Sequence, residues 1–379
     1  MLALLCCQTG FSLAEPVPIP SPPALGAKAY ILRDFNSGKV LVEHNADQRL
    51  EPASITKIMT AYVVFQEIRA GRLSEDDRAL ISVKAWHNPE VKGWTKGSRM
   101  FAEVNSQVAV SDLLRGLIIQ SGNDAAIALA EHIAGSEQAF VVLMNDAAAR
   151  LGLKDTHYMN ATGWPAEGHY TSARDIATLS AALIREFPEY YELYSEKSFT
   201  YNNITQANRN SLLWKDESVD GIKTGHTESA GYCLASSALR DGMRLISVVM
   251  GAPGPDARSK YSQSLFNYGY RFFETHRLFA GGAPLQEVRV WMGNEDMLKL
   301  GMGGDVYVTI PRGQYEHLKP VLQVRKRIDA PVADKEDVGR LEIYLDKKLI
   351  KTEPLVALNA VARGNFLQRF ADRIIYLFQ

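Results

Sequence analysis

Cysteine is scarce in this chain of 379 residues, which contains only Cys6, Cys7 and Cys233. Cys6 and Cys7 lie in an apolar N-terminal stretch, so removal of that stretch would leave one cysteine and no possible intrachain disulfide. The eight histidines form no H-E-x-x-H pair and no Cys/His cluster with metal-ligand spacing. The sequence therefore predicts no metal site and no cofactor.

An excess of charge of one sign and a long apolar run are also missing. The 42 Lys and Arg residues nearly balance the 43 Asp and Glu residues, so no broad basic field exists to hold a nucleic acid. No run of 18 apolar residues is present to span a bilayer as one helix. The composition, 46% apolar and 22% charged, is that of a globular protein. The length predicts two domains, or one large domain with an appendage.

The first residues have the composition of an export signal. Residues 1–14 (MLALLCCQTGFSLA) are mainly apolar, and their last three residues fit signal-peptidase cleavage before Glu15. A basic n-region is missing, which indicates a truncated signal. The alternative is a buried N-terminal helix, but the five prolines of residues 15–26 predict a stiff, extended linker instead of a docked element.

Periodicity predicts strands, then helices, then strands within residues 27–275. Strand patterns occur in residues 27–45, 231–238 and 243–250. Asn36-Ser37-Gly38 in the first pattern and Asp241-Gly242 between the other two predict hairpin turns. Apolar residues recur at helical spacing in residues 52–69, 111–119, 124–134, 138–151 and 172–186. This order predicts an α/β (α+β) domain in which helices flank a mixed sheet and the first and last strands are neighbours.

The rest of the chain changes character. Residues 276–361 consist of short alternating segments separated by Gly, Pro and Asp, which predicts a small all-β domain. Residues 362–379 are expected to form an amphipathic helix, because from residue 364 onward a wheel of about 100° per residue separates apolar from polar side chains. Arg369 and Arg373 lie on the polar side, which suits a helix in a membrane interface. A helix docked on the β domain or in a dimer contact is the alternative.

Ser54-Ile55-Thr56-Lys57 is an S-x-x-K sequence at the start of an expected helix. Residues i and i+3 share a helix face, so the Ser54 hydroxyl and the Lys57 amine can meet. A serine attacks once a base takes its proton, and an amine is such a base when burial or a neighbouring cation lowers its pKa. Free N–H groups of a first helical turn can also stabilise an oxyanion. Alone, the pattern is ordinarily a capping serine beside a solvated lysine.

Ser121-Gly122-Asn123 is an S-x-N turn between two apolar helices. Ser121 can relay a proton there, and the amide of Asn123 can orient a substrate amide. Alone, such a turn is ordinarily a helix cap, because Ser and Asn are favoured at that position.

Lys223-Thr224-Gly225 opens a strand. A strand edge can pair with an extended peptide, and glycine permits a close approach of backbone. Lys223 would add a positive charge that helps to keep Lys57 neutral and attracts a carboxylate. Alone, the triplet is an ordinary junction between a turn and a strand.

In combination the three patterns are specific. S-x-x-K, S-x-N and K-T-G occur in this order, and they are the serine acyl-transfer signature of β-lactamases and penicillin-binding proteins. The chain resembles the low-molecular-mass penicillin-binding proteins that act as D-alanyl-D-alanine carboxypeptidases, and a β-lactamase/transpeptidase-like fold is therefore expected. The resemblance covers residues 27–275 through the segments EPASITKIMT, GLIIQSGNDAAIALAEHIAG, QANRNSLLW and VDGIKTGHT. The β domain and the tail also match that family's architecture.

The resemblance implies a role for each catalytic residue. Ser54 would be the acylated nucleophile and Lys57 the base that activates it. Ser121 and Asn123 would line the opposite wall, and Ser121 would pass a proton to the leaving amine. Lys223 would tune the site.

The same resemblance implies the substrate contacts. Thr224 would bind the terminal carboxylate of the peptide, on the same strand as Gly225. His226 would contribute a backbone N–H to the oxyanion hole beside that of Ser54. Arg258 would help to hold the carboxylate, although its segment GAPGPDARSK is expected to be a loop and Arg244 also lies nearby in sequence.

The loop of residues 163–170 (GWPAEGHY) is expected at the floor of the site. Its Glu167 is a candidate deacylating base, as in one group of β-lactamases. The ordinary alternative is a solvated glutamate in a Gly/Pro loop.

The expected function is removal of the terminal D-alanine from peptidoglycan stem peptides, with β-lactams acylating the same serine. A DD-endopeptidase or a β-lactamase on the same fold is an alternative, and so is a catalytically weak wall-binding scaffold. The β domain and the tail argue against a free β-lactamase, and the complete motifs argue against a scaffold. We expect an exported protein bound peripherally at the periplasmic face of the cytoplasmic membrane, with no nucleic-acid partner.

Overall fold

The computed structural model describes residues 19–88 and 97–377. The predicted export signal, residues 1–14, and the first part of the predicted linker lie outside the described residues. The chain divides into two compact units, one spanning Ser21–Tyr270 and one that begins at Arg271.

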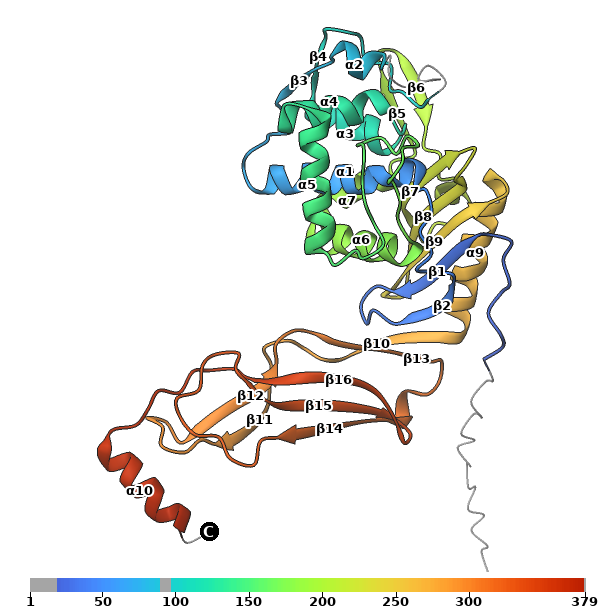
Figure 1. The fold of residues 1–379 in the computed structure, drawn as a ribbon. Coiled ribbons are helices and arrows are strands. Elements are labelled where there is room, and N and C mark those ends of the chain that lie inside the picture. Colours follow the sequence, from blue (N-terminus) through green and yellow to red (C-terminus); the bar gives the residue numbers. More distant parts are fainter. Residues whose placement is uncertain (1–18, 89–96, 378–379) are drawn as a thin grey trace, which may run out of the picture. The chain divides into compact units, whose positions relative to one another are not determined.

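A five-stranded antiparallel sheet crosses the first unit in the order β2-β1-β9-β8-β7 (Figure 1). Its strands are β1 (Ala29–Asp34), β2 (Val40–His44), β7 (Val219–Thr227), β8 (Gly231–Arg240) and β9 (Met243–Ala252). Strand β1 pairs with β9, with Ile31 opposite Val248. The expectation that the first and last strands are neighbours is therefore confirmed.

Both predicted hairpin turns of this sheet are confirmed. Asp241 and Gly242 have φ angles of 48° and 80°, which a two-residue turn requires when it joins twisted strands. In the first hairpin, the N–H of Ser37 donates to Asp34 Oδ1 at 2.6 Å, and Gly38 has a φ of 74°. These local turns impose the antiparallel pairing of β1 with β2 and of β8 with β9.

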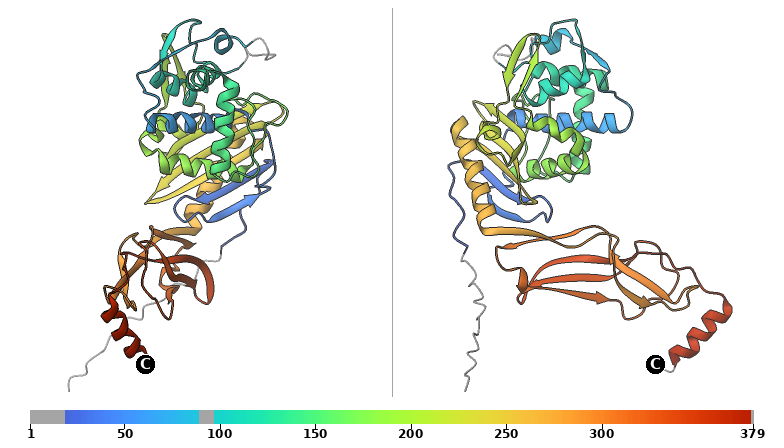
Figure 2. Two further views of the ribbon diagram at one scale, coloured as in Figure 1. Left: turned by 60° about the vertical axis from the view of Figure 1, so that its left-hand side comes forward. Right: turned by 180° about the vertical axis from the view of Figure 1, so that it is seen from behind.

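Helices cover both faces of the sheet (Figures 1 and 2). One face carries the group α1 (Lys57–Arg69), α3 (Val110–Ile118), α4 (Asn123–Ala134), α5 (Glu137–Arg150) and α6 (Ala173–Glu186). The side chain of Ile31 belongs to the apolar core under these helices. The next residue, Leu32, points to the opposite face, where a Cβ on Gly269 of α9 (Pro255–Phe272) would lie 3.0 Å from it.

Shorter elements complete the first unit. They are the strand pairs β3 (Arg78–Leu80) with β4 (Gln107–Ala109) and β5 (Ser198–Tyr201) with β6 (Ile204–Ala207), and the helices α2 (Val83–Trp86), α7 (Pro188–Tyr191) and α8 (Leu212–Lys215). The sequence patterns did not predict these elements, because each spans only three or four residues.

Two local expectations are corrected by the structure. The helix expected over residues 52–69 starts as a 3-10 turn, Ala53–Thr56, and α1 begins only at Lys57. Ala53 has a φ of 47°, so a regular α-helix cannot pass through it. The expected loop around Arg258 is the first part of α9, because Pro255 stands at the first residue of that helix, where a missing N–H is tolerated.

The second unit is built mainly from strands, as expected. β10 (Phe273–Phe279) pairs with β13 (Val306–Pro311). A five-stranded antiparallel sheet has the order β11-β12-β16-β15-β14. Its strands are β11 (Pro284–Arg289), β12 (Met297–Met302), β14 (Leu318–Val324), β15 (Asp337–Leu345) and β16 (Lys348–Ala357). Fully buried side chains such as Leu300, Leu341 and Leu355 form its core, and the terminal helix α10 (Phe366–Leu377) follows.

In the part of the chain that the structure describes, no single helix is long and apolar enough to cross a bilayer. The bent pair α4 and α5 meets that requirement by length and composition only.

Candidate active site

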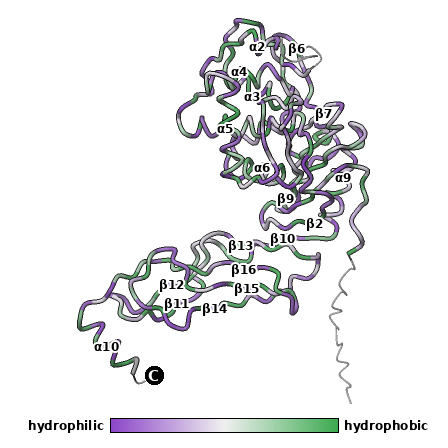
Figure 3. Tube along the Cα trace, in the orientation of Figure 1, coloured by the Kyte–Doolittle hydropathy of each residue, from purple (hydrophilic) through white to green (hydrophobic). Residues whose placement is uncertain are grey.

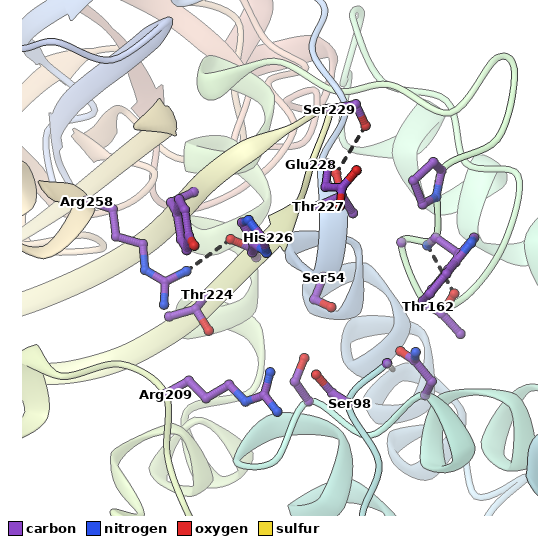
Figure 4. A pocket seen from close by; sticks show the side chains of 18 residues that line it. Ser54, Ser98, Thr162, Arg209, Thr224, His226, Thr227, Glu228, Ser229 and Arg258 are labelled. Carbon is purple, nitrogen blue, oxygen red and sulfur yellow. Dashed lines mark hydrogen bonds between the residues drawn. The ribbon is translucent and has the colours of Figure 1, made fainter. Parts of the chain in front are cut away.

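A cleft of about 830 Å³ opens in the first unit where several distant segments meet (Figure 4). The 3-10 turn, the turn between α3 and α4, the segment 162–165, strand β7 and the start of α9 all contribute side chains. Seven of the nine expected site residues line it: Ser54, Ser121, Asn123, Thr224, Gly225, His226 and Arg258. The other two, Lys57 and Lys223, are buried, with 1% and 3% of their surface exposed.

The Ser54 hydroxyl lies beside the Lys57 amine. The distance between Ser54 Oγ and Lys57 Nζ is 3.0 Å, although Ser54 belongs to the 3-10 turn and Lys57 is the first residue of α1. A 3-10 turn places residues i and i+3 directly above each other, so it brings the two side chains together as an α-helical turn does.

The three hydrogen-bond partners of Lys57 suit its neutral amine as well as its ammonium. Lys57 Nζ donates to Asn123 Oδ1 at 2.7 Å and to the carbonyl oxygen of Thr162 at 2.7 Å. Both oxygens can only accept, so they occupy two N–H groups, which is the full number that a neutral amine has. The remaining lone pair can then accept the O–H of Ser54. A hydroxyl is the only one of the three partners that can donate in this way.

Burial is the main reason that the Lys57 amine can lose its proton. Desolvation, helped by the positive charge of Arg209, lowers the pKa of Lys57 to about 7, while Asp124 and Glu137 act in the opposite direction. Burial also lowers the pKa of Lys223 well below its ordinary value, and the charge of Lys57 lowers it further. The two buried lysines therefore disfavour being protonated together.

Two glycines let neighbouring backbone close around the 3-10 turn. A Cβ on Gly225 of β7 would lie 3.0 Å from the carbonyl oxygen of Pro52 and 3.1 Å from the N–H nitrogen of Ile55. On the other side, Gly163 has a φ of 83°, and a Cβ there would overlap the carbonyl of Ala53. Glycine at the third position of K-T-G thus lets strand β7 approach the backbone of the turn that carries Ser54.

Ser121 has a free hydroxyl in a constrained place. Its φ is 62°, it is 2% exposed, and its Oγ has no hydrogen-bond partner among the residues that the structure describes. A buried polar atom without a partner is uncommon and points to a group that a ligand completes. The next motif residue, Asn123, donates its backbone N–H to the carbonyl oxygen of Ser98, another residue that lines the cleft.

Arg258 lies in the first turns of α9 and is 8% exposed. Its Nη1 donates to the carbonyl oxygens of Gly225 at 3.0 Å and Cys233 at 3.4 Å. Its Nε has no partner within the described chain, although it is buried. The alternative, Arg244, pairs instead with Asp220 and does not line the cleft.

Arg209 was missed by the sequence analysis. It follows β6, lines the cleft, and lies with Arg258 and Thr224 on one side of Ser54 in Figure 4. The only signal was its place in the segment QANRNSLLW, where an isolated arginine has no motif of its own. The two arginines make this end of the cleft positive, which suits a carboxylate.

The expected floor loop contributes Gly163, Trp164 and Pro165 to the cleft. Glu167 is exposed and does not line it, so the structure gives no support to Glu167 as a deacylating base. Across residues 19–88 and 97–377, no three histidine, cysteine, aspartate or glutamate side chains gather as a metal site.

Residues 17–254 match the family model of D-alanyl-D-alanine carboxypeptidases, and residues 273–363 match the C-terminal domain of penicillin-binding protein 5. The chain belongs to the D-alanyl-D-alanine carboxypeptidase family. The carboxypeptidase DacA of Escherichia coli strain K12 is 46% identical over 364 residues, which cover 95% of this chain and 90% of DacA.

Solved structures agree with this assignment. Penicillin-binding protein 5 from Haemophilus influenzae superimposes with a TM-score of 0.86 at 42% identity, covering 91% of this chain and 100% of that one. Penicillin-binding protein D2 from Listeria monocytogenes, solved in its ampicillin-bound form, has a TM-score of 0.56 at 29% identity, with coverages of 66% and 100%. The expected function is confirmed, and this carboxypeptidase is a serine-type enzyme whose family implies D-Ala-D-Ala substrates and β-lactam binding.

Proposed function

We propose that this carboxypeptidase works through an acyl-enzyme at Ser54, with Lys57 as the base. The observation that carries the proposal is the 3.0 Å contact between Ser54 Oγ and the buried Lys57 Nζ. A neutral Lys57 that donates to Asn123 and Thr162 keeps one lone pair for the Ser54 proton. Ser54 Oγ attacks the carbonyl carbon of the terminal D-Ala-D-Ala bond while its proton passes to Lys57. The C–N bond then breaks, the leaving amine takes a proton through Ser121, and water hydrolyses the ester to restore Ser54.

The remaining site residues bind and polarise the peptide. The backbone N–H groups of Ser54 and His226 stabilise the oxyanion, because β7 lies directly against the 3-10 turn. Thr224, Arg258 and Arg209 hold the terminal carboxylate at the positive end of the cleft. Lys223 is buried in the strand that carries Thr224, and its own protonation is disfavoured while Lys57 is charged.

Covalent labelling tests the acyl-enzyme. Protein treated with penicillin is digested, and mass spectrometry of the peptides is expected to find the adduct on Ser54. The adduct disappears in Ser54→Ala, and release of D-alanine from a pentapeptide disappears with it. The matched variant Lys57→Arg keeps a cation that cannot act as a base, so it also loses the adduct. An adduct on another residue, or labelling of Lys57→Arg at the rate of the unchanged protein, contradicts the proposal.

We also propose that the protein is exported and lies on the periplasmic face of the cytoplasmic membrane through α10. Along α10, hydrophobic and hydrophilic residues alternate with helical spacing (Figure 3). Phe366, Leu367 and Phe370 are 71%, 75% and 56% exposed, which is unusual for large apolar side chains. An exposed apolar helix face with arginines on its other side suits a bilayer interface.

The polar side of α10 is attached to the β unit. Asp372 is 7% exposed, and its carboxylate accepts hydrogen bonds from Arg289 Nη2 at 2.8 Å and from the N–H of Met292 at 2.5 Å. The helix thus docks on the β unit as one alternative anticipated, but through its polar side. The apolar side stays outward, so docking and membrane contact are compatible.

Vesicle sedimentation tests the membrane proposal. Deletion of residues 364–379 is expected to leave the protein in the supernatant with its rate of penicillin acylation unchanged. The double variant Phe366→Gln/Phe370→Gln is expected to lose binding to vesicles. Val321→Gln/Leu349→Gln replaces two other exposed apolar residues of the same unit and is the matched control. If the truncated protein stays with the vesicles, the proposed role of α10 is wrong.

A further inference from the structure

We propose that Asp124 is a positioning residue of this active site, which ties one wall of the cleft to helix α4 and places a carboxylate next to Asn123, the residue that accepts a hydrogen bond from Lys57. Asp124 follows the S-x-N triplet and was assigned no role by the sequence motifs. The second half of this inference rests on the proposed role of Lys57 as the base.

The carboxylate of Asp124 is saturated with backbone donors. Its Oδ1 accepts the N–H of Met100 at 3.0 Å and that of Ala125 at 3.0 Å. Its Oδ2 accepts the N–H of Phe101 at 3.0 Å and that of Ala102 at 3.3 Å. Asp124 is 1% exposed, so these four bonds replace its hydration. One side chain thereby fixes three consecutive residues of a segment that has no helix or strand of its own.

Two glycines provide the room for this contact. A Cβ on Gly122 would lie 2.7 Å from Asp124 Oδ1 and 3.2 Å from the backbone nitrogen of Met100. A Cβ on Gly116 would lie 2.5 Å from the sulfur of Met100. The glycine of the S-x-N triplet therefore leaves space for the Asp124 carboxylate two residues later. The four residues S-G-N-D depend on one another for this packing.

The fixed segment continues directly into the cleft. Gly97 and Ser98, which line the cleft, precede the anchored residues, and the carbonyl oxygen of Ser98 accepts the N–H of Asn123 at 2.8 Å. Helix α4 thus holds this wall through Asn123 and Asp124. Loss of the Asp124 bonds is expected to loosen the wall opposite β7, where a peptide has to fit.

The backbone donors around Asp124 favour its ionised form. Each carboxylate oxygen already faces two N–H donors, so a carboxylic proton would have no acceptor and would displace a bond. Burial raises the pKa of Asp124, and the four backbone N–H groups oppose that rise. Its place in the first turn of α4 also favours the anion, because the free N–H groups of a helix start carry partial positive charge.

The charges that face Lys57 come from four elements. Arg209, from the segment after β6, lowers the pKa of Lys57, and the charge of Lys57 in turn lowers the pKa of Lys223 in β7. Asp124 of α4 and Glu137 of α5 raise the pKa of Lys57. Glu137 is itself paired with Lys84 at 3.0 Å, whereas Asp124 has only neutral N–H partners. The charge of Asp124 is therefore the less compensated of the two and opposes the effect of burial on Lys57.

The variant Asp124→Asn tests both halves of the proposal. It keeps the shape, removes the charge, and turns an NH₂ group toward backbone donors. The rate constant of acylation by a fluorescent penicillin, measured from pH 5 to 9 and normalised to its plateau, reports the protonation of Lys57. Loss of the anion should lower the pKa of Lys57 further, so the acid limb of the acylation profile is expected to move to lower pH by about one unit. KM for a D-Ala-D-Ala peptide is expected to rise by about tenfold.

Two further variants keep the result interpretable. Asp175→Asn removes another buried carboxylate, which accepts the N–H of Asp155 but does not line the cleft, and it should change neither the acid limb nor KM. Asp124→Glu keeps the charge but displaces the cleft wall, so it should raise KM and leave the acid limb where it is. This variant replaces Asp124→Asn as the test if Asp124→Asn does not fold. An unmoved acid limb together with an unmoved KM in Asp124→Asn overturns the inference. Loss of the acid limb in the unchanged protein would instead contradict the role of Lys57.

Discussion

Lowering the pH should stop acylation at a point set by the burial of Lys57. With a pKa of about 7, roughly half of the Lys57 amines are neutral at pH 7, whereas an exposed lysine at 10.5 would be neutral in roughly one molecule in 3,000. The difference corresponds to about 5 kcal/mol, the net effect of burial and of the neighbouring charges on the ammonium. The rate constant for acylation should therefore have an acid limb centred near pH 7 and should fall about tenfold per pH unit below it.

Rapid mixing with a fluorescent penicillin at a series of pH values measures this limb for the free enzyme. Arg209→Gln gives an internal check of sign, because the positive charge of Arg209 lowers the pKa of Lys57. Removing that charge should move the acid limb to higher pH, opposite to the shift expected for Asp124→Asn. Since Lys57 and Lys223 are coupled, the midpoint is a property of the pair. An acid limb centred above pH 9 in the unchanged protein would refute the reasoning, and so would an acid limb that moves to lower pH in Arg209→Gln.

Three further predictions concern single residues. Gly225→Ala should slow acylation more than tenfold and cost about 1–3 kcal/mol of stability in thermal unfolding, because its Cβ presses on the turn that carries Ser54; normal acylation would contradict this. Arg258→Lys should raise KM for peptide more than it lowers kcat, since a lysine lacks the planar guanidinium fork that can hold a carboxylate while it bonds both carbonyls; unchanged KM would contradict it. Lys57→Met should exceed the unchanged protein in free energy of unfolding by the largest amount at pH 7. This difference, measured by urea unfolding, should shrink by about 1.4 kcal/mol per pH unit toward pH 10; a difference independent of pH would contradict it.

The sign of the last prediction follows from proton binding. The unfolded chain keeps the Lys57 proton up to its ordinary pKa of 10.5, whereas the folded protein loses it near 7. Between these values the unfolded state binds more protons, so the stability of the unchanged protein rises with pH. Lys57→Met removes this dependence.

Much of the fold follows from local patterns. The hairpins at Asn36-Ser37-Gly38 and Asp241-Gly242 were predictable because their turn residues adopt backbone angles that few others tolerate. Helix α9 was missed because the Gly and Pro residues at its start, read as a loop, are also compatible with a helix N-terminus. The 3-10 turn before α1 was missed because it depends on β7 and residue 163, which close around Ala53 from distant parts of the chain.

The same distinction holds for the site. The residues expected from S-x-x-K, S-x-N and K-T-G carry short-range signals, and the fold brings all of them except the two buried lysines to the lining of one cleft. Arg209 and Asp124 carry no such signal, because their effects arise in the folded chain from electrostatic influence on Lys57 and from hydrogen bonds of Asp124 to residues 100–102. The spacing of residues in the sequence does not predict these interactions. The charge balance at the base is therefore a property of the folded protein alone.

A direct titration of Lys57 tests the central claim. Protein labelled at lysine Nζ and Cε is followed by NMR from pH 5 to 10, and Lys57→Arg identifies the resonance. The account predicts a Lys57 amine that loses its proton near pH 7, in step with the acid limb of acylation. An amine that stays protonated beyond pH 9 while Ser54 is acylated at full rate would contradict it.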